Sequence, residues 1–203
     1  MTQTYKLSDL ADIKSGYTFR GKIEEVLEGT AYIVQPKEFR YTKEVKIQDN
    51  IEVKDLPQIV WEGRPSAFID QECVLLPIRG EYREALYVSE SDLGIGLPII
   101  ASAQFAVIYP KSTILTAYLC WVLGQTDCQN YLSQAGEGSV IKTLKLSDIS
   151  DMPIYLPTKK VQEQLVNLHK CWQKERKLTQ KLLDNREQML KGIYQQILKE
   201  EQL

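Results

Sequence analysis

The sequence contains one histidine, His169, and no CxxC pair among its cysteines. One histidine excludes catalytic triads and histidine-based metal clusters, because both need imidazole groups placed among other polar side chains. A Walker loop (GxxxxGK[ST]), a nucleophile elbow (GxSxG) and a zinc-protease motif (HExxH) are also missing. The sequence therefore indicates a binding module without catalytic activity or a bound metal.

Long apolar runs and a secretory leader are lacking as well. The longest apolar runs, such as residues 97–101, are far too short to span a bilayer, and the N-terminus has no apolar core. The cysteines are too sparse for a disulfide scaffold. We therefore expect a cytoplasmic protein with reduced thiols at Cys73, Cys120, Cys128 and Cys171.

Basic charge is scarce in most of the chain. Residues 1–157 hold 15 lysines and arginines against 21 acidic residues, whereas residues 158–203 hold 10 against 6. A protein that binds nucleic acid by bulk electrostatics has a basic domain. Any DNA affinity of residues 1–157 must therefore come from local basic loops or from a partner's surface.

Proline is absent after Pro157, and glycine occurs there only at Gly192. Residues 158–203 therefore predict one long helix, carried by a domain of residues 1–157. Such a helix is on the order of 60 Å long, which exceeds the width of a domain of that size. Its apolar side, hereafter the helix stripe, recurs at a period near 3.6 and comprises Val161, Leu165, Leu168, Trp172, Leu182, Leu190, Ile193 and Ile197. The stripe predicts pairing with a partner helix, and the alternative is that the helix packs against its own domain.

Residues 1–157 predict an α+β domain of short strands and helices. Residues 5–13 predict a strand or turn entering a helix, and residues 112–133 predict a helical pair with a break near Gly124. An internal echo opens and closes the domain, with KLSDLADI at 6–13 and KLSDISDM at 145–152. Short apolar runs between turn residues predict strands at 31–35, 44–47, 58–61, 73–78, 84–88, 97–101, 104–109 and 151–156.

Three loops combine arginine or lysine with aromatic and amide side chains, which suits contacts to DNA phosphates and base edges. The alternative for each residue is an ordinary solvated surface charge. The candidates are Tyr17, Arg20 and Lys22 in the first loop, Gln35, Lys37, Arg40, Tyr41 and Lys43 in the second, and Arg79, Tyr82 and Arg83 in the third. Further candidates beside a glycine-rich turn are Ser139 and Lys142.

One catalytic alternative stays open. Glu52 and Lys54 form an ExK triplet, which a metal-dependent nuclease would place on a strand with an aspartate nearby to share the metal. Such triplets are common in charged chains, and we therefore prefer a binding module.

The order of these segments resembles the specificity (S) subunit of type I restriction–modification systems. The resemblance covers nearly the whole chain and follows KLSDLADIKSGYTFRGK, CVLLPIRG, LTAYLCWVLGQ and EGSVIKTLKLSDISDMPIYLPTKKVQEQLV. Its most specific stretch is residues 138–165. A typical member of that family has two target recognition domains and two long helices that pair as an antiparallel spacer, whereas this chain has one of each, so it resembles a half-length form.

The resemblance implies a non-catalytic DNA-binding protein. Residues 1–157 would form the target recognition domain, and residues 158–203 would provide dimerisation, spacing and methyltransferase docking. The implied partners are double-stranded DNA, a second copy in an antiparallel homodimer, methyltransferase (M) subunits and a restriction (R) subunit. A symmetric dimer implies an interrupted palindromic site, and S-adenosylmethionine would bind the M subunit and not this chain. The alternative is a protein-only coiled-coil adaptor that does not bind DNA.

Overall fold

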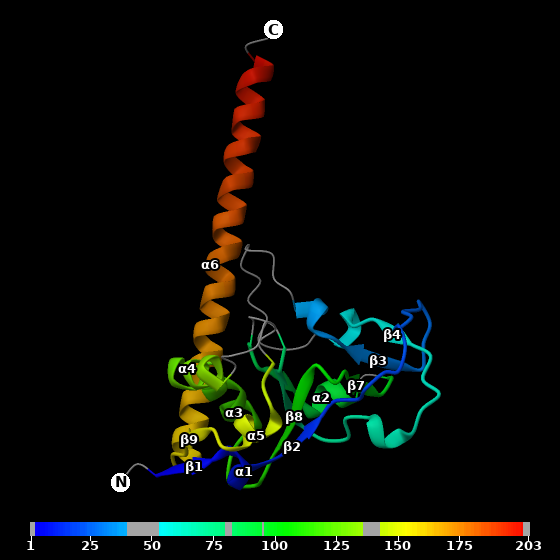
Figure 1. Cartoon of the computed structure of the whole chain (residues 1–203). Coiled ribbons are helices and arrows are strands. Elements are labelled where there is room, and N and C mark those ends of the chain that lie inside the picture. Colours follow the sequence, from blue (N-terminus) through cyan, green and yellow to red (C-terminus); the bar gives the residue numbers. More distant parts are fainter. Residues whose placement is uncertain (1–2, 40–52, 80–82, 95, 136–142, 201–203) are drawn as a thin grey trace. The chain divides into compact units, whose positions relative to one another are not determined.

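The computed structural model describes residues 3–39, 53–79, 83–94, 96–135 and 143–200 of the chain (Figure 1). The chain forms two compact units, Met1–Gln164 and Leu165–Leu203. Short strands and short helices make up the first unit, and the 42-residue helix α6 (Lys159–Glu200) begins in it. The predicted α+β class with one long C-terminal helix is confirmed. Among the described residues, no helix is both long and apolar enough to cross a membrane.

The larger sheet of the first unit has four antiparallel strands. In spatial order they are β2 (Ala11–Ser15), β8 (Phe105–Pro110), β5 (Cys73–Pro77) and β6 (Leu86–Val88). All residues of β5 are buried, because the strand has neighbours on both edges and is contacted by α3 (Thr116–Leu123). Cysteine, valine and leucine form the continuous apolar run that such a strand requires.

A second sheet has three strands. In spatial order they are β4 (Gln58–Ile59), β3 (Ala31–Val34) and β7 (Ile99–Ala101), and β3 pairs antiparallel with β4 but parallel with β7. Successive side chains of a strand point to opposite faces. Tyr32 and Val34 join an apolar cluster shared with the larger sheet, whereas Ala31 and Ile33 join a second cluster that includes Phe19. Both faces of β3 are therefore covered.

The two copies of the sequence echo fold alike and lie beside each other. Each copy contains a short helix, α1 (Leu7–Leu10) in the first and α5 (Leu146–Ser150) in the second. The strand before α1, β1 (Thr4–Lys6), pairs antiparallel with the strand after α5, β9 (Pro153–Tyr155). In each copy the third helical residue caps the first turn: Asp9 accepts a hydrogen bond from the Lys6 backbone N–H at 3.2 Å, and Asp148 accepts one from Lys145 at 3.4 Å. An ion pair of 2.7 Å joins Lys6 to Asp151.

Seven of the eight predicted strands contain a strand, and the eighth, 44–47, lies outside the described residues. Strand β2 was not predicted, because its five residues include only two apolar ones. The predicted helical pair is confirmed as α3 and α4 (Thr126–Ala135) with a break at Gly124, although α3 begins four residues later than expected, at Thr116. The other helical segments of the described residues are α2 (Glu90–Leu93) and the 3-10 turns Pro36–Phe39, Val53–Asp55 and Pro65–Ala67.

Candidate nucleic-acid interface

Gly16 places the first candidate loop between the two sheets. Its backbone N–H donates to the Phe105 carbonyl at 3.0 Å, and the next N–H, of Tyr17, donates to the Ala101 carbonyl at 2.7 Å. A Cβ atom at position 16 would lie 2.2 Å from the carbonyl oxygen of Ser102, closer than real contacts allow. Only glycine therefore fits at position 16. The next residue, Tyr17, lies at the surface, and 40% of its area is exposed.

Four aromatic side chains, hereafter the aromatic cluster, form around Trp61. They are Tyr17, Phe19, Trp61 and Phe68. The ring centroid of Trp61 lies 4.8 Å from Tyr17, 6.0 Å from Phe19 and 6.2 Å from Phe68, and the rings of Tyr17 and Phe19 meet it at steep angles of 82° and 72°. Edge-to-face contacts of this kind are favourable beyond the area that they bury. The cluster therefore holds the first candidate loop in place.

Trp61 and Phe68 were not among the residues predicted from the sequence. The available signal was Gly63, which follows Trp61 within a turn of Glu, Gly, Arg and Pro. A Cβ atom at position 63 would lie 2.3 Å from Cζ2 of Trp61, so glycine gives the indole room to fold over the chain. The indole nitrogen of Trp61 is buried without a hydrogen-bond partner in the described structure.

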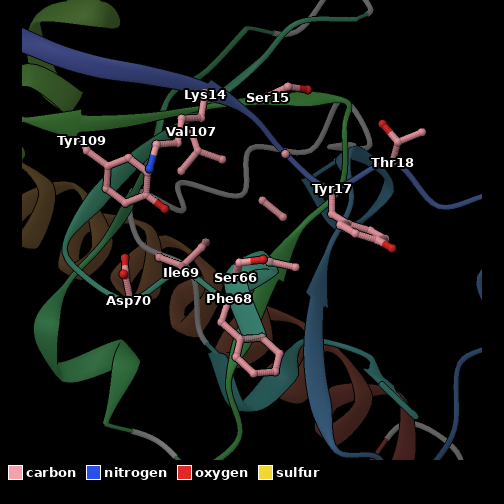
Figure 2. A pocket seen from close by; sticks show the side chains of 13 residues that line it. Lys14, Ser15, Tyr17, Thr18, Ser66, Phe68, Ile69, Asp70, Val107 and Tyr109 are labelled. Carbon is pink, nitrogen blue, oxygen red and sulfur yellow. The ribbon is translucent and has the colours of Figure 1, made fainter. Parts of the chain in front are cut away.

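A pocket of about 260 Å³ lies beside the aromatic cluster (Figure 2). Its wall includes Lys14 and Tyr109 on the larger sheet, Tyr17 on the first loop, and Phe68 and Asp70 on the segment before β5. The Nζ atom of Lys14 lies 5.1 Å from the centre of the Tyr109 ring, a cation–π contact. Burial raises the pKa of Tyr109 to about 12, so its hydroxyl stays protonated at neutral pH. The pocket thus combines a cation, a carboxylate and aromatic faces.

The first two candidate loops differ in how their charges are partnered. Arg20 and Lys22 are exposed and have no hydrogen bond or ion pair within the described part of the chain. Lys37, in contrast, forms an ion pair with Glu25, and Gln35 donates a hydrogen bond to the same carboxylate at 3.4 Å. The first loop therefore offers two free cations to an anionic ligand, whereas the second loop is partly neutralised.

In the third candidate loop, one arginine is exposed and the other is buried. Arg79 is exposed and forms a β-bridge with Thr143. Only 5% of Arg83 is exposed, and its guanidinium donates a hydrogen bond to the carbonyl of Leu132. Burial lowers the pKa of this guanidinium below its usual value. The expectation of a surface arginine at position 83 is therefore wrong, because the side chain is buried and hydrogen-bonded to α4.

Several candidates lie outside the described residues. These are Arg40, Tyr41, Lys43, Tyr82, Ser139 and Lys142, so their roles stay predictions. The first residue of the possible nuclease triplet, Glu52, lies outside as well, and the residues after it form a 3-10 turn (Val53–Asp55) instead of the strand that a nuclease would need. The described residues contain no group of three or more His, Cys, Asp or Glu side chains that could hold a metal ion.

Gln162, which the sequence analysis also missed, anchors the first turn of α6. The residue is completely buried, and its Oε1 accepts a hydrogen bond from the Leu115 N–H at 2.9 Å, next to the first residue of α3. Its Nε2 donates to the carbonyls of Thr113 at 3.3 Å and Pro157 at 2.9 Å. One amide side chain thus satisfies three backbone groups.

The helix stripe is largely open to solvent in the single chain. Leu168 is 68% exposed and Leu190 is 63% exposed, high values for side chains of this kind. Leu165 is half-buried. The other members are exposed by 40% to 52%, namely Val161, Trp172, Leu182, Ile193 and Ile197. A stripe of apolar residues with this exposure has the character of an interaction surface.

Comparison of the chain with models of known protein families gives no match. No curated protein matches the sequence either.

Solved structures of type I restriction–modification (R-M) proteins are similar in fold. A chain from a study of complex assembly and conformational transition in the type I R-M system gives a TM-score of 0.59 at 15% identity. The HsdS subunit from Thermoanaerobacter tengcongensis gives 0.57 at 16%, and the type I R-M S subunit from M. genitalium gives 0.51 at 13%. The matches cover 86%, 86% and 83% of this chain.

Each match covers 38% of the solved chain, so the present chain corresponds to well under half of each of these structures. Similarity at these low identities shows the fold. The chain therefore has the fold of one part of a type I R-M specificity subunit.

Proposed function

We propose that the chain is a DNA sequence-specificity subunit of a type I restriction–modification complex and has no catalytic activity of its own. The observation that carries the proposal is the similarity in fold to two S subunits over 86% and 83% of the chain. The exposed, unpaired Arg20 and Lys22 beside the aromatic cluster support DNA binding by the first unit. Positively charged and aromatic side chains are the groups that contact phosphates and bases.

The assembly that we propose is a symmetric dimer. Two copies of α6 pair antiparallel through the helix stripe, which places two recognition domains at a fixed separation. Such a dimer reads an interrupted palindrome, because the symmetry of the site mirrors that of the protein. M subunits dock on the helices, bind S-adenosylmethionine and methylate adenine. An R subunit adds DNA cleavage. The complex acts in the cytoplasm.

Mapping methylated sites tests this function directly. The chain is co-expressed with its partner methyltransferase, and the methyladenine positions in the host DNA are determined by sequencing. We expect methylation within one interrupted palindromic sequence, and no methylation when the chain is omitted. The proposal fails if the purified chain, with its methyltransferase present, neither retards any DNA of a randomised library nor directs methylation.

A protein-only adaptor is the second candidate, favoured by the acidic balance of residues 1–157 and by the pairing of Lys37 with Glu25. Charge reversal at two exposed arginines, Arg20→Glu with Arg79→Glu, separates the candidates. A specificity subunit loses DNA affinity while its assembly with the methyltransferase is retained. An adaptor binds no DNA with or without the substitutions, and its assembly with the methyltransferase is unchanged.

A further inference from the structure

The aromatic cluster joins two segments that are distant in the sequence. Tyr17 and Phe19 come from the first candidate loop, whereas Trp61 and Phe68 come from the segment between β4 and β5. Both segments also line the pocket of Figure 2, where Thr18 and Ser66 are labelled. Segments 17–19 and 61–68 therefore lie side by side on one surface, although about 40 residues separate them.

This surface contains a third free cation, Arg64. Arg64 is exposed and, within the described residues, forms no ion pair or side-chain hydrogen bond, as is also the case for Arg20 and Lys22. It follows Gly63, whose Cα lies against the Trp61 ring, so the backbone next to Arg64 is held by the cluster. Many other lysines of the first unit are already engaged, namely Lys6, Lys14, Lys37 and Lys111.

We propose that segment 61–68 is a second DNA-contacting arm, the first arm being the first candidate loop. Arg64 in this second arm binds a backbone phosphate beside the phosphates bound by Arg20 and Lys22. This inference rests on the proposed function and extends it to a segment that the sequence analysis did not identify. Free arginines on a rigid loop suit phosphate contacts, because the guanidinium donates several hydrogen bonds in a fixed geometry. Trp61 acts as a positioning residue, since it fixes both arms relative to each other.

Glu62, on the same segment, should affect DNA affinity in the direction opposite to Arg64. It is exposed, lies two residues before Arg64 and forms no ion pair in the described structure. A carboxylate on a surface that faces DNA repels the phosphates. Removing its charge must therefore strengthen binding, whereas removing the charge of Arg64 must weaken it.

The experiment measures DNA affinity of the full chain, assembled with its methyltransferase, at several salt concentrations. We expect Arg64→Gln to weaken binding on the order of tenfold, the effect of losing one charged hydrogen bond. The slope of log affinity against log salt should fall by about 1, equally for matched and mismatched sites. Glu62→Gln should strengthen binding. Lys145→Gln is the matched control, because it removes an exposed charge that lies outside both arms.

The outcomes separate this inference from the proposed function. If the unmodified complex binds no DNA, the proposed function itself fails. If the complex binds and Arg20→Gln weakens it, but Arg64→Gln and Glu62→Gln both behave like Lys145→Gln, then segment 61–68 does not face DNA and the inference fails. Circular dichroism of each variant shows whether the fold is retained, and an exposed side chain at position 64 gives no reason for it to be lost.

Discussion

Two buried polar side chains, Gln162 and Arg83, hold backbone groups that belong to distant parts of the sequence. Gln162 bonds to Leu115, 47 residues away, and Arg83 bonds to Leu132, 49 residues away. Glutamine and arginine are usually exposed, and local sequence carries no sign of a partner that tertiary packing supplies. This is why the sequence predicted a surface role for Arg83 and assigned none to Gln162.

Replacing Gln162 with leucine should destabilise the first unit. The substitution leaves the Leu115 N–H and the carbonyls of Thr113 and Pro157 without their partner in a partly buried site. A buried group that loses its partner costs about 1–3 kcal/mol, so we expect a loss of about 2–4 kcal/mol. Urea denaturation measures it, and Gln164→Leu, an exposed position on the same helix, serves as the control. Equal stability of the two variants would contradict this account.

A buried thiol, Cys73, and a partly buried phenol, Tyr109, make the fold sensitive to alkali. Burial raises the pKa of Cys73 to about 12, and that of Tyr109 also to about 12. Both values exceed those of the unfolded chain, which are about 8.5 for cysteine and 10 for tyrosine. Each group therefore contributes stability below its unfolded pKa, and this contribution is lost as pH rises toward 12, because only the unfolded state ionises readily.

We accordingly expect the free energy of unfolding to fall progressively from about pH 9 upward. Denaturant titrations at pH 8, 10 and 11 measure this fall. Tyr109→Phe should make the decline between pH 10 and 11 shallower, whereas Tyr194→Phe, at an exposed position, should leave it unchanged. A stability that is constant over this range would contradict the prediction.

At the scale of elements, the sequence predicts what depends on local pattern. The runs at β5, β7 and β8 are apolar throughout or nearly so, and their strands are confirmed. Strand β2 was not predicted because its extended form depends on pairing with β8, which lies about 90 residues away in the sequence. The aromatic cluster escaped for the same reason, since two loops build it. Local pattern therefore predicts most strands, whereas the candidate surface depends on long-range packing.

Gly16→Ala tests the passage between the two sheets. The added methyl group would lie 2.2 Å from the Ser102 carbonyl oxygen and 2.7 Å from that of Ala101, so the backbone must move. Forced overpacking costs about 1–3 kcal/mol, and we expect reduced DNA binding because the first loop moves with Gly16. Gly21→Ala is the matched control, since nothing lies within 4 Å of its Cβ position. Thermal unfolding of the two variants gives the comparison, and similar midpoints would show that the passage tolerates a side chain.

At the scale of the whole molecule, the proposed assembly depends on the helix stripe. The stripe is interrupted by the polar residues Glu175, Thr179 and Arg186 near its middle. In an antiparallel pair the middle of one helix meets the middle of the other. Polar positions there favour one register over the alternatives at some cost in stability. The distance between two recognition domains would then follow from the length of α6, about 60 Å for 42 residues.

Leu168→Asp should convert the proposed dimer to a monomer. A charge buried without a partner in the helix interface costs about 3–5 kcal/mol, enough to dissociate a moderately stable pair. Sedimentation velocity of the chain measures the change. Gln188→Asp adds the same charge to the opposite side of α6 and should leave the dimer intact. A mass that is unchanged by Leu168→Asp would exclude the stripe from the interface.

The pairing of β1 with β9 brings a strand near the beginning of the first unit beside the last strand before α6. Units with adjacent ends tolerate circular permutation and insertion into other chains. The first unit therefore has the properties of an exchangeable cassette. If the chain has the proposed function, a recombination event that replaces the residues between the two KLSD copies would join a different recognition domain to the same helix and change the DNA target in a single step.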